Sequence, residues 1–119
     1  MPRDAAILLD MLISARRALE YVRGKTQNEF LADGALQDMV VRRLEIVGEA
    51  AVRVSQETRD SLPGIPWRKV VGLRNVLIHQ YFRLDLDRVW EVLQDDLPKL
   101  IAALEPVVPP PGTSQATGT

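Results

Sequence analysis

Residues 33–54, DGALQDMVVRRLEIVGEAAVRV, decide the fold of this 119-residue chain. Asp33 can cap a helix, and apolar side chains recur after it every three or four positions, which places them on one helical face. These side chains belong to Leu36, Val40, Leu44, Val47, Ala51 and Val54. Gly48 lies inside this helix, where glycine costs about 1 kcal/mol relative to alanine. It marks the close approach of another helix or is simply tolerated.

The same analysis extends to both sides of this helix. Upstream, residues 7–22 show a second stripe of apolar side chains, and Gly24 can end that helix. Downstream, residues 61–66, SLPGIP, break the chain because two prolines and a glycine fix turn geometry and remove backbone donors. Trp67 opens a third helix with apolar residues around nearly its whole circumference. We expect that helix to be buried on most sides, by its own chain or by a partner.

A fourth helix can start at Asp85 or Asp87, with a stripe from Leu86 to Leu104 and a kink at Pro98. Residues 107–119, VVPPPGTSQATGT, carry no charge and contain three consecutive prolines, which is typical of an unstructured end. The sequence therefore predicts an all-α fold. We expect an up-and-down four-helix bundle over residues 1–105, with a flexible, disordered tail at 106–119. Trp67 and Trp90 are interpreted as core residues.

Composition restricts the chemistry that the chain can perform. It contains no cysteine and a single histidine, which excludes disulfides, thiolate metal sites and a His-rich zinc cluster. Any catalysis is expected to need no metal or to use carboxylate-bound ions. No apolar run approaches the roughly 18 residues that span a bilayer, and the N-terminus lacks a signal peptide. We expect a cytoplasmic protein without a membrane partner.

The net charge of −1 conceals a strong local asymmetry. Residues 61–84 carry four basic and no acidic side chains, whereas residues 85–105 carry six acidic and two basic ones. The positive segment also holds the only histidine, within RNVLIHQY at residues 74–81. This octet combines a permanent cation, a carboxamide, an imidazole and a phenol. Each of these groups can act on a phosphodiester.

An ideal helix would not direct these four side chains toward one point. At 100° per residue, Asn75 and His79 share one face, while Arg74 and Tyr81 share another, about 140° from His79. They could converge if the helix ends near His79, if the Arg74 side chain wraps round, or if a symmetric partner supplies the missing group. The last two explanations are favoured.

Each of these residues also has a purely structural interpretation. Arg74 falls in line with apolar positions, so it needs a carboxylate partner or a wet site, and the partner could be Glu49 or Glu45. Asn75 could satisfy loop carbonyls, and Tyr81 could anchor the helix end. A lone histidine near a helix end, such as His79, is more often structural than catalytic.

The octet resembles the signature of the HEPN superfamily, and within it that of the HepT-like toxins: Arg, four residues, His, one residue, Tyr. Arg74, His79 and Tyr81 match it without a gap. The likeness also includes VVRRLEIVGEA, the IPW turn, GLRN and VWEVLQDDLPKL, and it covers roughly residues 5–105.

The resemblance implies the toxin of a type VII-like toxin–antitoxin system. Such toxins are metal-independent endoribonucleases without a cofactor, whose homodimer brings two motifs to one cleft. Arg74, His79 and Asn75 would then be catalytic, with Glu49 in a supporting role. The resemblance also implies a partner, an MntA-like minimal nucleotidyltransferase that silences the toxin by adenylylating Tyr81. The chief rival is a binding module that docks a nucleotidyltransferase or a nucleotide without cutting RNA, and a weaker rival is a purely structural bundle.

Overall fold

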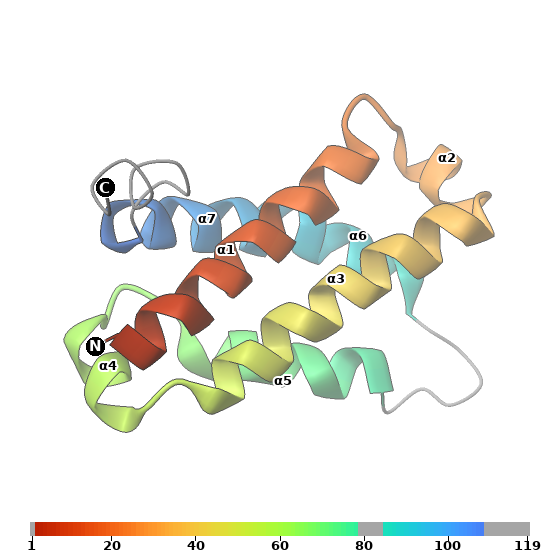
Figure 1. Ribbon diagram of the computed structural model, residues 1–119. Coiled ribbons are helices and arrows are strands. Elements are labelled where there is room, and N and C mark those ends of the chain that lie inside the picture. Colours follow the sequence, from red (N-terminus) through yellow and green to blue (C-terminus); the bar gives the residue numbers. More distant parts are fainter. Residues whose placement is uncertain (1, 79–84, 109–119) are drawn as a thin grey trace.

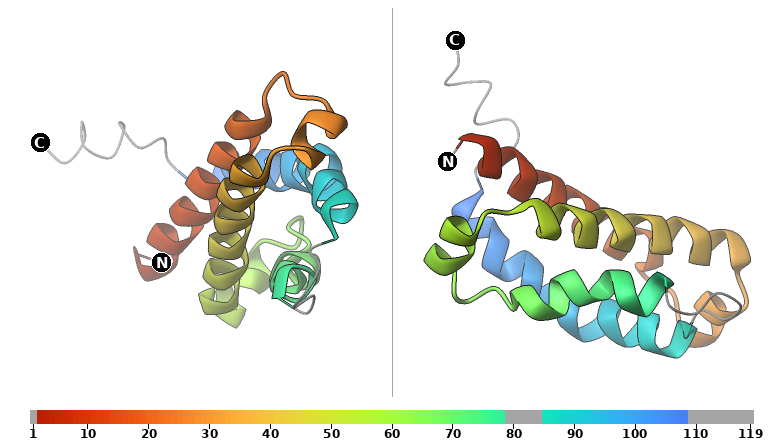
Figure 2. Two further views of the ribbon diagram at one scale, coloured as in Figure 1. Left: turned by 90° about the vertical axis from the view of Figure 1, so that its right-hand side faces the viewer. Right: turned by 90° about the horizontal axis from the view of Figure 1, so that it is seen from below.

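The computed structural model describes residues 2–78 and 85–108, with side chains described for residues 4–73 and 85–108. Four antiparallel rods form the bundle (Figures 1 and 2). The first three are α1 (Pro2–Val22), α3 (Gly34–Arg53) and α5 (Trp67–Ile78). The fourth consists of α6 (Leu86–Glu91), a π-helical turn η1 (Val92–Asp96) and α7 (Leu97–Leu104). The described residues include no strand, and the predicted all-α, up-and-down architecture is confirmed.

The core lies where α1 and α3 pack together and where α7 covers α1. Fully buried leucine, valine and methionine side chains fill it, among them Met11, Leu44, Val47 and Leu97. Small residues also lie at buried positions, namely Ala15, Ala18, Gly48, Ala50 and Ala51. Small side chains let helix backbones approach closely, and Gly48, read from the sequence as either a close approach or a tolerated glycine, is among the buried residues.

The predicted helix boundaries largely coincide with those in the structure. The Asp33 side chain caps α3 by accepting a hydrogen bond from the Leu36 backbone N–H at 3.0 Å. Gly24 ends α1 with a φ of 74°, a conformation that glycine adopts without strain. The turn at residues 61–66 separates α4 (Gln56–Ser61) from α5, which begins at Trp67 as predicted.

Two short helices were not predicted from the sequence. Helix α2 (Gln27–Leu31) starts with a capping box, in which the Thr26 hydroxyl accepts from the Glu29 N–H and the Glu29 carboxylate accepts from the Thr26 N–H. These hydrogen bonds, led by the one from the backbone, lower the pKa of Glu29. Ser55 caps α4 in a similar way through the Thr58 N–H. Both helices are shorter than two turns, so no stripe of apolar residues marks them.

The ends of the fourth rod differ in detail from the prediction. Near Pro98, where the sequence predicted a kink, the rod contains the π-helical turn η1, which ends at Asp96, two residues before this proline. At the C-terminal end, α7 continues into a 3₁₀ turn, η2 (Glu105–Val107), and Val108 is buried. Described structure therefore extends three residues past the predicted boundary at residue 105. The predicted disorder of the rest of the tail, residues 109–119, falls outside the described residues.

A buried carboxylate ties the start of α1 to α4. Asp4 is 3% exposed and accepts hydrogen bonds from the hydroxyl groups of Ser55, at 2.6 Å, and of Thr58. These two bonds, with that of Ser55 the stronger cause, hold the pKa of Asp4 below its ordinary value of 3.8. The ionised carboxylate therefore stabilises the folded chain.

We expect Asp4→Asn to lower the unfolding midpoint at neutral pH. A depressed folded-state pKa stabilises the fold above the unfolded-state pKa, and this stabilisation disappears as the pH falls through the folded-state value. The difference between wild type and variant should therefore shrink below about pH 4. Thermal unfolding followed by circular dichroism across this range measures it. A difference that stays constant at low pH would contradict this account.

Candidate active site

Helix α5 carries the first two residues of the candidate site. Arg74 and Asn75 lie on its regular backbone, and the helix continues to Ile78. His79 and Tyr81 lie outside the described residues. Because α5 is helical past Arg74, the spacing argument holds over this part of the motif, with successive residues turned by about 100°.

The start of α5 is fixed by Trp67. Its indole N–H donates to the Leu62 carbonyl at 3.1 Å. The guanidinium of Arg59 lies over the indole, 5.8 Å from the ring centroid, and also donates to the carbonyl of Ala51 at 2.8 Å. Arg59 thus links the last turn of α3 to the first turn of α5. Trp67 is only half-buried, but it packs against the core as the sequence indicated.

Helix α6 follows the motif segment in sequence and packs on α2. Asp85 caps this helix by accepting from the Arg88 N–H at 3.1 Å, as the sequence allowed. Trp90 packs on Phe30 of α2 with a ring-centroid distance of 5.5 Å, and the Gln27 amide donates to Asp87 at 3.0 Å. Residues 79–84, which include His79 and Tyr81, connect the end of α5 to α6, whose start is capped by Asp85.

Glu49, the predicted supporting residue, lies on α3, the helix against which α5 packs. Its side chain is exposed, whereas that of Glu45 is half-buried. Neither forms an ion pair with another residue whose side chain is described. The pairing of Arg74 with either glutamate stays a prediction, because the Arg74 side chain is outside that set.

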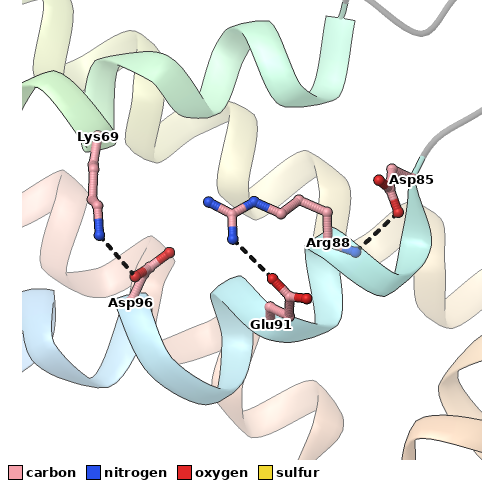
Figure 3. A network of polar contacts seen from close by, with 5 residues as sticks. All are labelled: Lys69, Asp85, Arg88, Glu91 and Asp96. Carbon is pink, nitrogen blue, oxygen red and sulfur yellow. Dashed lines mark hydrogen bonds and ion pairs between the residues drawn. The ribbon is translucent and has the colours of Figure 1, made fainter.

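The basic and acidic segments meet across a groove between α5 and the fourth rod (Figure 3). Lys69 of α5 lies 3.8 Å from Asp96 of η1, and on the same rod Arg88 pairs with Glu91 at 2.9 Å. One ion pair thus joins the basic segment 61–84 to the acidic segment 85–105. Such exposed pairs contribute only about 0–1 kcal/mol each, so they leave the charged groups available to other partners.

The described residues also bear on metals and membranes. No group of three or more His, Asp or Glu side chains in residues 4–73 and 85–108 is placed to hold a metal ion. Across the same part of the chain, no helix has the length and apolar character needed to cross a bilayer.

Comparison with known proteins identifies the family. The family described as Ribonuclease HepT-like matches residues 11–107, and the chain belongs to it. "Putative RNase MJ1380" of Methanocaldococcus jannaschii is 38% identical over 100 residues, which cover 84% of this chain and 92% of that protein. "Probable ribonuclease HepT" of Thermococcus cleftensis is 36% identical over 86 residues, covering 72% of this chain and 78% of that protein.

A third relative shows the same domain within a longer protein. "Gamma-glutamylcyclotransferase and putative RNase MJ0434" of Methanocaldococcus jannaschii is 39% identical over 101 residues, which cover 84% of this chain but 46% of that protein. No solved structure matches the chain significantly. Family membership and the names of these relatives support a ribonuclease.

Proposed function

We propose that this chain is a metal-independent endoribonuclease, the toxin of a type VII-like toxin–antitoxin system that acts on RNA in the cytoplasm. The observation that carries the proposal is the motif R-x-x-x-x-H-x-Y, which begins at Arg74 on α5 in a chain of the ribonuclease HepT-like family. RNA contains its own nucleophile, the 2′-hydroxyl. The protein needs only to move protons and to stabilise the extra negative charge of the phosphorane.

Each motif residue has a role in this reaction. His79 removes the 2′-hydroxyl proton or protonates the leaving 5′-oxygen. Arg74 binds the scissile phosphate and stabilises its developing charge, because a guanidinium donates paired hydrogen bonds to phosphate oxygens. Asn75 orients His79 or a phosphate oxygen, and Glu49 supports Arg74 from α3. The products are a 2′,3′-cyclic phosphate and a 5′-hydroxyl.

Dimerisation is part of this mechanism. One histidine cannot easily be base and acid in a single step, whereas a twofold dimer brings His79 and its symmetry mate to one cleft. Helix α5 supports the proposed dimer. Its apolar residues lie around nearly the whole helix, but within the chain it packs mainly on α3, and Val71 stays half-exposed.

Purified wild-type protein should cut single-stranded RNA in the presence of a metal chelator. Mapping of the product ends should give 2′,3′-cyclic phosphates and 5′-hydroxyls, since the 2′-oxygen is the attacking atom. Cleavage that stops when divalent ions are removed would contradict metal independence. RNA or nucleotide binding without any cleavage would favour the rival function of a binding module.

A nucleotidyltransferase partner is proposed to control the enzyme through Tyr81. The Tyr81 phenol oxygen attacks the α-phosphate of ATP, pyrophosphate leaves, and AMP stays on the tyrosine as a phosphodiester. Tyr81 is two residues from His79. A bulky group with a negative phosphate at that place competes with RNA for Arg74.

After co-expression with an MntA-like nucleotidyltransferase, intact-mass analysis should show added AMP on the wild-type chain and none on Tyr81→Phe. Tyr21→Phe is the matched control, because Tyr21 is the other tyrosine and lies on α1. That variant should keep the modification. AMP retained on Tyr81→Phe would assign it to another hydroxyl group.

A further inference from the structure

The groove between α5 and the fourth rod has an apolar floor and a charged mouth. Its volume is about 210 Å³. The floor residues are at most 8% exposed and comprise Val70, Leu73, Val92, Leu97 and Leu100. Lys69, Asp96 and Lys99 surround the mouth. We call this feature the α5–α7 groove.

The π-helical turn η1 shapes one wall of the groove. Val92 and Asp96, its first and last residues, both line the cavity. Helix α5, the opposite wall, packs mainly on α3 rather than on the fourth rod. The space between the two walls is therefore not filled by the side chains of the described residues. Single π turns within α-helices are frequent at functional sites.

The size of the groove suits one planar ring. An apolar cavity of about 150 Å³ holds benzene, whereas pockets for drug-sized ligands usually exceed about 300 Å³. A cavity of about 210 Å³ lies between these limits. A volume of this size is in the range that one base of a nucleic acid strand needs.

The charges at the mouth suit the phosphates that flank such a base. The Lys69 side chain is 69% exposed, and its ammonium lies at the long distance of 3.8 Å from the carboxylate of Asp96. Pairs of this kind are weak, so Lys69 can exchange Asp96 for a phosphate oxygen. Lys99 is exposed and forms no ion pair with any side chain that the structure describes.

The groove lies near the candidate active site along α5. Leu73 of the floor directly precedes Arg74, and Lys69 lies five residues, about 7.5 Å of helix rise, before it. A strand whose scissile phosphate is held by Arg74 would follow the surface of α5 through about 140° of turn to reach Lys69 at the mouth of the groove. Only a single strand can splay out a base in this way.

We propose that the α5–α7 groove binds one base of single-stranded RNA next to the cleavage point, while Lys69 and Lys99 contact the flanking phosphates. The inference rests on the proposed function, because RNA is the substrate. Asp96 competes with RNA for Lys69 and so limits its affinity.

Binding can be measured apart from cleavage. His79→Ala protein, expected to be inactive, is titrated with a fluorescent single-stranded RNA of about 12 nucleotides at several salt concentrations. Introducing Lys69→Gln and Lys99→Gln into this protein should reduce the slope of the logarithm of the RNA-binding constant against the logarithm of the salt concentration by about 1.4. Each phosphate contact contributes about 0.7 to this slope. Asp96→Asn should have the opposite effect and tighten binding at low salt. The matched control is the pair Arg17→Gln and Lys25→Gln, two exposed cations on and after α1, which should leave the slope unchanged.

Photo-crosslinking locates the base. RNA containing 4-thiouridine should attach to peptides from residues 66–73 or 92–100. Crosslinks confined to other segments, no RNA binding, or equal slope changes for the two double variants would overturn the proposal. Wild-type cleavage of the same RNA separates the two ideas. RNA bound in the groove but never cut contradicts the ribonuclease alone, and RNA cut with an unchanged lysine slope contradicts the groove alone.

Discussion

His79→Ala is expected to reduce RNA cleavage by about 10²- to 10⁴-fold, the usual contribution of a general acid or base. Arg74→Ala should cost about 10²- to 10³-fold, because it removes a donor to the charge that develops on the phosphate. Single-turnover cleavage of a defined RNA measures both rates. Arg17→Ala, which removes an exposed arginine of α1, is the matched control and should retain wild-type activity.

The double variant sharpens this prediction. If Arg74 and His79 act in one step, losing both should cost little more than losing the worse of the two, because catalytic groups that work together are not additive. Unfolding curves must show that each variant is folded. Wild-type rates in both single variants would disprove the assigned catalysis.

Mixing the two single variants tests whether the site is shared between chains. A dimer of one Arg74→Ala chain and one His79→Ala chain still contains one intact arginine and one intact histidine. If these groups meet across the dimer, the co-purified mixture should cut RNA faster than either variant alone. Activity that remains at the level of the single variants would place both groups in one chain or show that the cleft requires both histidines.

Phe30→Ala is expected to produce the largest loss of stability, about 3–5 kcal/mol. Phe30 is completely buried and packs on Trp90, and it is the one buried side chain of α2. A five-residue helix cannot persist without such packing. Since small domains are stable by about 5–15 kcal/mol, this loss can unfold the chain at moderate temperature.

Urea denaturation measures the effect. The matched control is Leu31→Ala at the next position of α2, where the side chain is 37% exposed. It should cost clearly less, because much of its surface is already in water. Similar losses for the two variants would contradict the claim that the packing of buried Phe30 stabilises α2 more than its exposed neighbour does.

The four rods were predictable because α1, α3 and the fourth rod carry long stripes of apolar residues, whereas α5 is apolar around nearly its whole circumference. Asp33 and Asp85 also occupy cap positions that the structure confirms. The tie between Asp4 and α4 was not predictable. It joins residues more than 50 positions apart, and no local pattern reports such a contact. The short helices α2 and α4 were not predicted for a different reason. Their signal is local, in the spacing of Thr26 to Glu29 and of Ser55 to Thr58, but too brief for a periodicity to reveal.

The candidate site was found from residue types and their spacing rather than from burial. Sequence identified Arg74, Asn75, His79 and Tyr81, and the structure places the first two on α5. The α5–α7 groove could not be predicted. It depends on a π turn and on the distance between two rods, and neither is encoded in a run of neighbouring residues.

The π turn also divides the fourth rod mechanically. Regular α-helical hydrogen bonds run through α6 and through α7, but between them the Leu97 N–H bonds to the Val92 carbonyl, one residue further back than usual. The regular α-helical register therefore does not continue from α6 into α7. Helix α7 is held by α1, while α6 is held by α2 and follows directly on the segment of His79 and Tyr81. The wider turn at η1 therefore changes the rotation of α6 relative to α7, and Val89, Val92 and Leu93 still reach the hydrophobic core.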